Sequence, residues 1–567
     1  KIPVPKDVVM KQPKEFSIVG TSRKNVDGEK IVTGKPLFGI DVKHDGMLFA
    51  MIAFPPAFGM KLKSFDATEV KKMPGIKDVF SIKTYQDDYK RNGFDTDAFP
   101  EVVAIVGNST WELMNAKMAL KVEWEPISDT NIDAEWGGPQ VIPAGLESTA
   151  DHKAKMKEMA AKPGRQVRRD GNPEEAFKAA AKVIERTYTA PFLSHFPMEP
   201  MNFFANVTTD KAEVEGPLQA PEFIEKSLSA RLGMPLDKID IKMTRMGGGF
   251  GRRAYSHYVV EAALISQKIK APVKLIYSRE DTTNFGVFRP AYMTTYRAAL
   301  DADNNLIAYH VKAGGIPEGS LHADGFPAGA VDNYLAESWS VKTNITIGAF
   351  RAPGSNFNGA AEQSFLDEVA EAAGKDPIEF RLELFKRAKE NPVGTRNDYD
   401  ADRYAEVLRL VREKSGWGKE PAGKKRGVAA YFCHNSYAAH VVDVVMEGEQ
   451  PRVERVCSAL DCGIVVNPDA AANMVEGAVV DGIGNAMYGE MTFTKGAADK
   501  DNFSLYRIIR HNEAPKSIDV HFVKNEIAPT GLGEPPFPPV FAALANALYK
   551  ATGKRYYHQP FINNSFE

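Results

Sequence analysis

The chain has 567 residues, with 71 Lys and Arg against 74 Asp and Glu and a net charge of −3. This length is enough for about three or four domains of ordinary size. Lys and Arg are spread along the chain rather than clustered, which argues against nucleic-acid binding, and no apolar run approaches the roughly 20 residues that cross a bilayer. The three cysteines are too few for a conventional iron–sulfur cluster, which needs about four thiolates. We expect them to be structural thiols.

Short β-like runs alternate with turns between about residues 33 and 125, as in Met47–Phe54 and Val102–Val106. Helices are expected over Trp111–Leu120 and, more briefly, over Asp66–Met73, where Pro74-Gly75 would end the turn. The pattern is typical of an α+β domain. The polar residues 1–15 indicate an arm, and the pattern-poor residues 126–165 a linker.

A second α+β region is expected from about residue 166. Glu222–Leu232 has a helical pattern that ends at Gly233, and Ile239–Thr244 is a strand that leads directly into a glycine loop. Apolar residues at helical spacing predict a helix over Glu362–Ala373. Asp376, followed by Pro377 and Glu379, predicts the capped start of another helix.

A basic, turn-rich stretch over Lys419–Arg426 marks a further boundary. Beyond it, strands are expected at Val441–Met446 and Val453–Leu460. Helices are expected at Asn473–Tyr488, which is rich in glycine, and at Val540–Ala551, whose apolar residues share one face.

Two segments could approach an anionic ligand. Gly247–Gly251 is a glycine loop through which backbone N–H groups can come close to a ligand, although it lacks the GxGxxG spacing of dinucleotide-binding loops. Phe350-Arg351-Ala352 places an arginine between a strand and a helix, where it could hold an anionic cofactor. Each is weak alone, since a tight turn and a salt-bridged surface arginine are the commoner explanations.

Gly533 and Glu534 lie in the sequence Gly-Leu-Gly-Glu-Pro-Pro. A carboxylate between glycines and prolines lies on a stiff loop with a fixed direction, so Glu534 could act as a general base. A solvated loop glutamate is the alternative. His195 stands beside only one carboxylate, Glu199, which does not make a metal site. We interpret it as a structural histidine.

In order along the chain, these segments resemble the molybdenum-binding large subunits of the xanthine oxidase and aldehyde oxidoreductase family. The resemblance covers about residues 16–567 and implies an α+β fold, with a hammerhead-type domain before a large two-part cofactor-binding region. The implied division is an arm (1–15), the hammerhead domain (16–127), a linker (128–165), and cofactor-binding domains 1 (166–420) and 2 (421–567).

The resemblance also implies residue roles. Gln219 would hydrogen-bond the apical oxo group of molybdenum, and Glu534 would be the catalytic base. The cofactor would be bound by two loops and the residue before the base: Gly248, Gly249, Phe250, Gly251, Phe350, Arg351, Ala352 and Gly533. No side chain is expected to ligate the metal. The implied reaction oxidises an aldehyde or hydroxylates an N-heterocycle, with oxygen from water and hydride transfer to Mo=S.

One family element is missing. The Met-Gly-Gln-Gly-type loop that also grips the cofactor usually lies between the strand at Gly427–Ala429 and a stretch that here begins near Tyr437, and this chain joins those points directly. Isoquinoline 1-oxidoreductase beta-type subunits carry this loop near the N-terminus. We therefore expect that subtype, with the loop on a preceding fragment or a separate chain.

The subtype implies further expectations. The cofactor would be a molybdopterin cytosine dinucleotide, and the electrons would pass to a small partner subunit with two [2Fe-2S] clusters, with a cytochrome c as a further candidate. A periplasmic location is expected, because such subunits are commonly exported folded. Ala254 replaces the glutamate of purine oxidisers, and no arginine lies between Arg297 and Arg351, so purines are disfavoured. Ala352 replaces the copper-binding cysteine of carbon monoxide dehydrogenases. A cofactor-less scaffold subunit with the same fold is the alternative.

Overall fold

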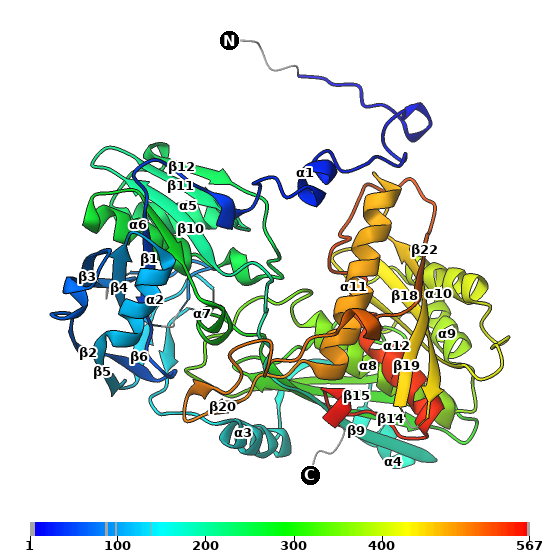
Figure 1. Ribbon diagram of the computed structural model, residues 1–567. Coiled ribbons are helices and arrows are strands. Elements are labelled where there is room, and N and C mark those ends of the chain that lie inside the picture. Colours follow the sequence, from blue (N-terminus) through cyan, green and yellow to red (C-terminus); the bar gives the residue numbers. More distant parts are fainter. Residues whose placement is uncertain (1–5, 86–88, 97–98, 137, 449, 564–567) are drawn as a thin grey trace.

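The computed structural model describes residues 6–85, 89–96, 99–136, 138–448 and 450–563. Its strands form large seven-, five- and four-stranded sheets covered by helices, so the predicted α+β class is confirmed. Figure 1 shows the seven-stranded sheet in one lobe and the other two sheets in a second lobe. Among the described residues, no helix has both the length and the apolar character needed to cross a membrane.

The seven-stranded sheet combines strands from two distant parts of the chain. Its order is β12-β11-β10-β13-β1-β4-β3, and β1 pairs in parallel with β13, with Leu48 opposite Val273. The expected hammerhead segment (16–127) therefore shares a sheet with the region that follows it. The strands are β1 (Leu48–Ala53), β3 (Ile76–Lys83), β4 (Glu101–Gly107), β10 (Asn202–Val207), β11 (Ala212–Gly216), β12 (Ile239–Met243) and β13 (Val273–Ile276).

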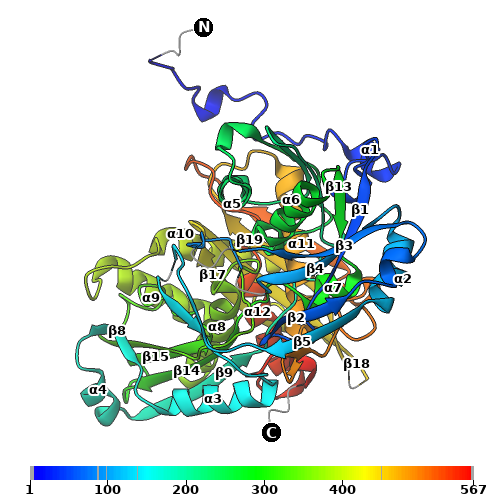
Figure 2. The ribbon, with the colours of Figure 1, turned by 90° about the vertical axis from the view of Figure 1, so that its left-hand side faces the viewer.

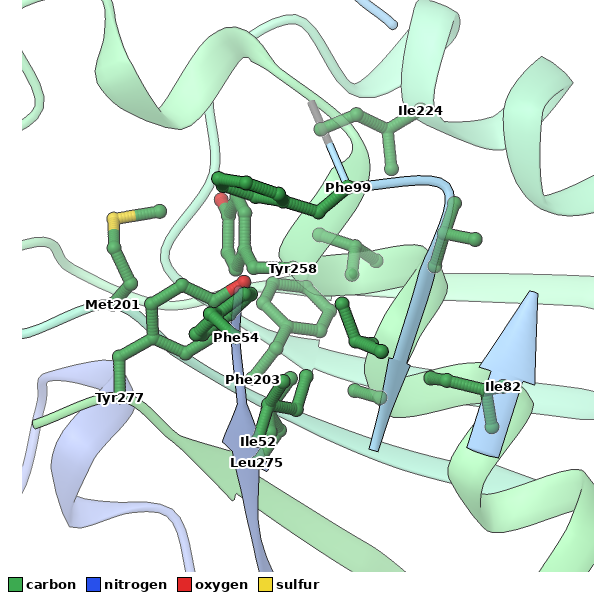
Figure 3. Close-up of a cluster of buried hydrophobic side chains, with 14 of the residues drawn as sticks. Ile52, Phe54, Ile82, Phe99, Met201, Phe203, Ile224, Tyr258, Leu275 and Tyr277 are labelled. Carbon is green, nitrogen blue, oxygen red and sulfur yellow. The ribbon is translucent and has the colours of Figure 1, made fainter. Parts of the chain in front are cut away.

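Alternating side chains give this sheet two buried faces. Ile52 faces the largest core cluster, which includes residues of α5 (Pro221–Leu232) and α6 (His257–Ile269). Met51, its neighbour, faces a smaller cluster with α2 (Thr110–Ala119). Figure 3 shows the first face, where side chains from β1, β10 and β13 meet those of α5 and α6: Ile52, Phe203, Leu275, Ile224 and Tyr258.

The other two sheets share α8 (Ser355–Ala372) as a central support, since α8 contacts β14 and β9 on one side and β17 and α12 on the other (Figure 2). The five-stranded sheet contains β8 (Arg165–Asp170), β9 (Lys182–Ala190), β14 (Ala291–Leu300), β15 (Leu306–Ile316) and β16 (Asn333–Ser340). The four-stranded sheet contains β17 (Lys425–Cys433), β18 (Ser436–Glu447), β19 (Gln450–Asp461) and β22 (Ser517–Phe522).

Shorter strands pair outside these sheets: β2 (Met60–Asp66) with β5 (Lys121–Pro126), β6 (Thr130–Ile132) with β7 (Gln140–Ile142), and β20 (Phe493–Thr494) with β21 (Ala497–Ala498). The remaining α-helices are α1 (Gly28–Val32), α3 (Thr149–Ala161), α4 (Pro173–Ala179), α7 (Arg279–Asn284), α9 (Pro377–Glu390), α10 (Ala401–Ser415), α11 (Pro468–Tyr488) and α12 (Pro538–Thr552).

The capping residues confirm two of the local predictions. The helix α5 ends at Gly233, whose left-handed backbone suits glycine, and the carboxylate of Asp376 accepts hydrogen bonds from the first amides of α9. The helix expected over Asp66–Met73 is wrong, because β2 continues to Asp66 and only a single 3-10 turn follows. The segment interpreted as a linker contains α3, which buries only two of its side chains and so has little hydrophobic periodicity.

The segment around Arg23 and Asp27, which follows the expected arm (1–15), lies between the two lobes, and residues 1–5 are outside the described part (Figure 1). The amide of Arg23 donates to the side chain of Asn467, which caps α11, and the Asn467 side chain donates back to the Arg23 carbonyl oxygen. Asp27 pairs with Arg245, at 2.7 Å, next to the glycine loop. This segment therefore ties α11 of one lobe to the end of β12 in the other.

Candidate functional site

The glycine loop Gly247–Gly251 follows β12 and is shaped by close backbone contacts. Gly248 and Gly251 have φ angles of +96° and +104°, which side chains rarely adopt. A Cβ atom on Gly251 would lie 1.9 Å from the carbonyl oxygen of Ala349. The carboxylate of Glu199 accepts the amide of Gly247 at 2.6 Å and so fixes the start of the loop. Glycine is therefore required for the conformation and for the approach to Ala349.

Gln219 follows β11 and points into this loop. Its side-chain oxygen accepts the amide of Gly251 at 3.2 Å. A Cβ atom on Gly249 would come within 2.6 Å of the same oxygen, so the glycine leaves room for the glutamine. The two segments that the sequence predicts to meet at the cofactor thus lie in direct contact.

The Phe350–Ala352 segment lies against the same loop. The amide of Arg351 donates to the carbonyl oxygen of Phe250 at 3.0 Å, and both Phe250 and Ala352 have positive φ angles near +55°. Non-glycine residues with positive φ are uncommon and mark a tightly determined backbone. The Phe250 side chain is 38% exposed, whereas Phe350 is buried beside His195.

His195 supports this segment from within the core. Its Nε2 lies 2.7 Å from the carbonyl oxygen of Ala349, and burial lowers the pKa of the ring to about 3, so it is neutral. The described residues hold no cluster of three or more His, Cys, Asp or Glu side chains placed to bind a metal. The contact with Ala349 supports the segment, and the structural role of His195 stays a prediction.

The Arg351 guanidinium joins this segment to the loop of the expected base. Its Nε and Nη2 donate to the carbonyl oxygen of Gly533 at 2.9 and 2.5 Å, and its Nη1 lies 3.1 Å from the carboxylate of Asp481 on α11. The guanidinium carbon also lies 5.4 Å from the ring centroid of Phe537. Arg351 thus holds Gly533 through its side chain and Phe250 through its backbone.

Both carboxylate oxygens of Glu534 have partners. Oε1 accepts the amide of Ala352 at 2.8 Å, and Oε2 lies 2.6 Å from Nε2 of His434. Burial alone would raise the pKa of Glu534, but the hydrogen bonds from His434 and Ala352 and the charges of His434 and Arg351 hold it below its ordinary value. Glu534 is therefore an ionised, oriented carboxylate at neutral pH.

Three hollows flank this arrangement, and one of them, of about 720 Å³, is lined by residues that include Ala349, Phe350 and Pro353. An open groove of about 700 Å³ is lined by Phe250, Arg351 and residues of α11, including Gly477 and Asp481. A cavity of about 430 Å³ lies beside His434 and the start of α8. It is lined by aromatic and acidic side chains, including Tyr404, Tyr431, Phe432, Asp324, Glu362 and Asp398. The groove lies next to the glycine loop, and the cavity lies next to His434, the partner of Glu534.

The structure brings all the predicted site residues into one continuous arrangement. The contacts run from Gln219 to the glycine loop, then through Phe250 to Arg351, and on to Gly533 and Glu534. Sequence reasoning missed His434 and Asp481. A signal for His434 existed, because His-Asn between two β-like runs is typical of a tight hairpin turn. Asp481 had no comparable signal on its glycine-rich helix.

Family models for the molybdopterin cofactor-binding domain match residues 153–385 and 361–515. The chain is a molybdenum-binding subunit of the xanthine oxidase family. It is 28% identical to a membrane-bound aldehyde dehydrogenase (pyrroloquinoline-quinone) of Gluconacetobacter polyoxogenes over 97% of this chain and 73% of the relative. It is 26% identical to the isoquinoline 1-oxidoreductase subunit beta of Brevundimonas diminuta over 96% and 68%, respectively.

Solved structures of an aldehyde oxidoreductase and a quinoline 2-oxidoreductase have the same fold. The aldehyde oxidoreductase of Desulfovibrio desulfuricans superposes with a TM-score of 0.78 at 15% identity, covering 97% of this chain and 80% of that chain. Quinoline 2-oxidoreductase of Pseudomonas putida 86 gives 0.77 at 15% identity, covering 96% and 97%. These likenesses confirm the fold class, and the family membership identifies the chain as an oxidoreductase.

Proposed function

We propose that this chain is the catalytic subunit of a molybdenum hydroxylase that oxidises an aldehyde or hydroxylates an N-heterocycle, with water as the oxygen source. The observation that carries the proposal is the contact between Glu534 and the Ala352 amide, which places an ionised carboxylate against the predicted cofactor-binding segments. General bases need this combination of fixed position and ionised state. The names of the relatives, an aldehyde dehydrogenase and an isoquinoline 1-oxidoreductase subunit, support the two substrate classes.

The residues present fit a bound molybdopterin. The glycine loop leaves no space for side chains at Gly249 or Gly251, and an open groove lies directly beside Phe250 and Arg351. The loop would receive the metal end of the cofactor, and Arg351 would hold the adjoining backbone. When bound, the cofactor supplies the activated oxygen of water and the acceptor for the hydride, which carries the two electrons of the oxidation. The cytosine dinucleotide form is part of this proposal.

Glu534 and Gln219 would then have different roles. Glu534 takes a proton from the attacking oxygen, and Gln219 orients the metal end through its side-chain amide. Substrate would occupy the 430 Å³ cavity, because its lining residue His434 touches Glu534 directly. Its aromatic side chains suit a flat molecule.

Electron transfer requires partners in this proposal. All three cysteines of the chain are free and buried, and none lies in a thiolate cluster. A small subunit with two [2Fe-2S] clusters would accept the electrons, and a cytochrome c would follow it. A preceding fragment or separate chain would supply the Met-Gly-Gln-Gly-type loop. A periplasmic location completes the proposal.

Glu534→Gln in the purified complex tests the base. The amide keeps the shape but cannot accept the proton, so turnover falls by about 10²–10⁴-fold while the molybdenum content stays unchanged. Glu526→Gln, an exposed change eight residues earlier in the chain, is the matched control and keeps normal turnover. Near-normal turnover of Glu534→Gln refutes the assignment. Turnover by a complex that lacks molybdenum refutes the proposed cofactor. The alternative of a cofactor-less scaffold subunit is then favoured.

A further inference from the structure

His434 occupies a rigid turn between β17 and β18. Cys433 pairs with Ser436, and the two residues between them, His434 and Asn435, have φ angles of +49° and +58°. Positive φ at both central residues defines the hairpin turn that matches strand twist. The backbone of His434 is therefore fixed by the pairing of two strands of the four-stranded sheet.

The loop that carries Glu534 is bound to this turn. The amide of Gly531 donates to the carbonyl oxygen of His434 at 3.2 Å, and the Ser436 hydroxyl lies 2.6 Å from the hydroxyl of Thr530. A Cβ atom on Gly531 would lie 2.7 Å from the Cβ of His434, so the two backbones are close-packed. The distance between the imidazole and the carboxylate is thus set by the fold.

We propose that His434 is a positioning residue that aims the Glu534 carboxylate and keeps it ionised. The inference rests on the proposed role of Glu534 as the base. Nε2 of His434 lies within hydrogen-bond distance of Oε2 of Glu534, and the amide of Ala352 donates to Oε1. The two contacts fix the plane of the carboxylate from two directions. A hydrogen bond to a carboxylate is stronger when its donor carries a positive charge, as a protonated imidazole does.

Glu534 is the carboxylate that the imidazole of His434 contacts directly. Other titratable groups near the turn are the buried Cys433, Arg403, which donates to the carbonyl oxygen of Asn435 at 3.1 Å, and Arg351, whose charge acts on Glu534. The same cavity is also lined by His322, Asp324, Glu362, Asp398, Tyr404 and Tyr431. The hydrogen bond to Glu534 raises the pKa of His434 despite partial burial, and the same contact lowers the pKa of Glu534. The two shifts agree in sign with a charged pair.

The pH dependence of kcat/KM in the purified complex tests the proposal. His434→Asn keeps a residue that tolerates the left-handed turn but removes the imidazole. Without its partner, the half-buried Glu534 becomes easier to protonate, so the acid limb moves to higher pH by roughly one unit. His434→Arg retains a cation and keeps the acid limb near its original position. His521→Asn, on β22, is the control. A lowered kcat with an unmoved acid limb would mean a purely structural role and overturn the proposal.

A second measurement does not depend on turnover. Exchange of the imidazole C2 hydrogen with deuterium, followed by peptide mass spectrometry of the full chain, gives the titration midpoint of His434. The midpoint lies above the ordinary value of about 6.5 in the original chain and falls in Glu534→Gln. An unchanged midpoint refutes the pairing. A shifted midpoint with normal turnover of Glu534→Gln refutes only the base assignment.

Discussion

The backbone amide of Arg351 donates to the carbonyl oxygen of Phe250 at 3.0 Å, and its guanidinium holds the carbonyl oxygen of Gly533. One residue thus joins three segments that are far apart in the sequence. Because Phe250 belongs to the lobe of the seven-stranded sheet and Gly533 to the other lobe, Arg351 also couples the two lobes at the candidate site. Changes at this junction are expected to affect cofactor retention before they affect the fold.

Replacing Gly251 by alanine should release the cofactor. The added Cβ would collide with the carbonyl oxygen of Ala349, at 1.9 Å, so the glycine loop must move away from Arg351. We expect a large loss of molybdenum per chain, measured by elemental analysis of the purified protein. Gly374→Ala is the matched control, because Gly374 also has positive φ but no atom within 4 Å of the added Cβ. Equal molybdenum in both variants would contradict this prediction.

Arg351→Lys should not be a conservative change. Lysine carries the charge but cannot donate to Gly533 and Asp481 with the fixed geometry of a guanidinium. Loss of these partly buried hydrogen bonds is expected to cost about 1–3 kcal/mol and to lower both the melting temperature and the molybdenum content. Arg396→Lys is the control, since the Arg396 side chain is 72% exposed in its pair with Asp398. A variant that melts and retains metal like the control would show that charge alone suffices.

Glu261 on α6 should make the fold less stable as pH rises. Burial raises the pKa of Glu261 to about 8, despite the hydrogen bond from Tyr277. Because this folded-state pKa lies above the unfolded value of about 4.3, its stabilising effect is complete below that value and is lost as pH rises through about 8. The melting temperature of Glu261→Gln should therefore fall less between pH 5 and 8 than that of the original chain. Parallel curves would be the contrary result, and exposed Glu222→Gln is the control.

Local structure was largely predictable where short-range chemistry decides it. The Asp376 cap and the Gly233 helix end depend on neighbouring residues alone, and both are present. The start of α8 was missed, because residues 355–359 include Ser, Asn and Gly and are buried by tertiary packing rather than by an apolar stripe. The pairing of β1 with β13 could not be predicted from the sequence either, because a parallel contact between residues 48 and 273 has no local signal.

The sequence alone determined which residues could form the site: a glycine loop, a Phe-Arg segment and a glutamate between glycines and prolines, in an order that resembles one family. It could do so because backbone freedom, charge and loop stiffness are properties of short segments. Only the tertiary structure decided how they meet. The hydrogen bonds that join Gln219 to Gly251, Arg351 to Gly533 and His434 to Glu534 each span 32 residues or more. Such contacts depend on the packing of whole sheets, which no short pattern encodes.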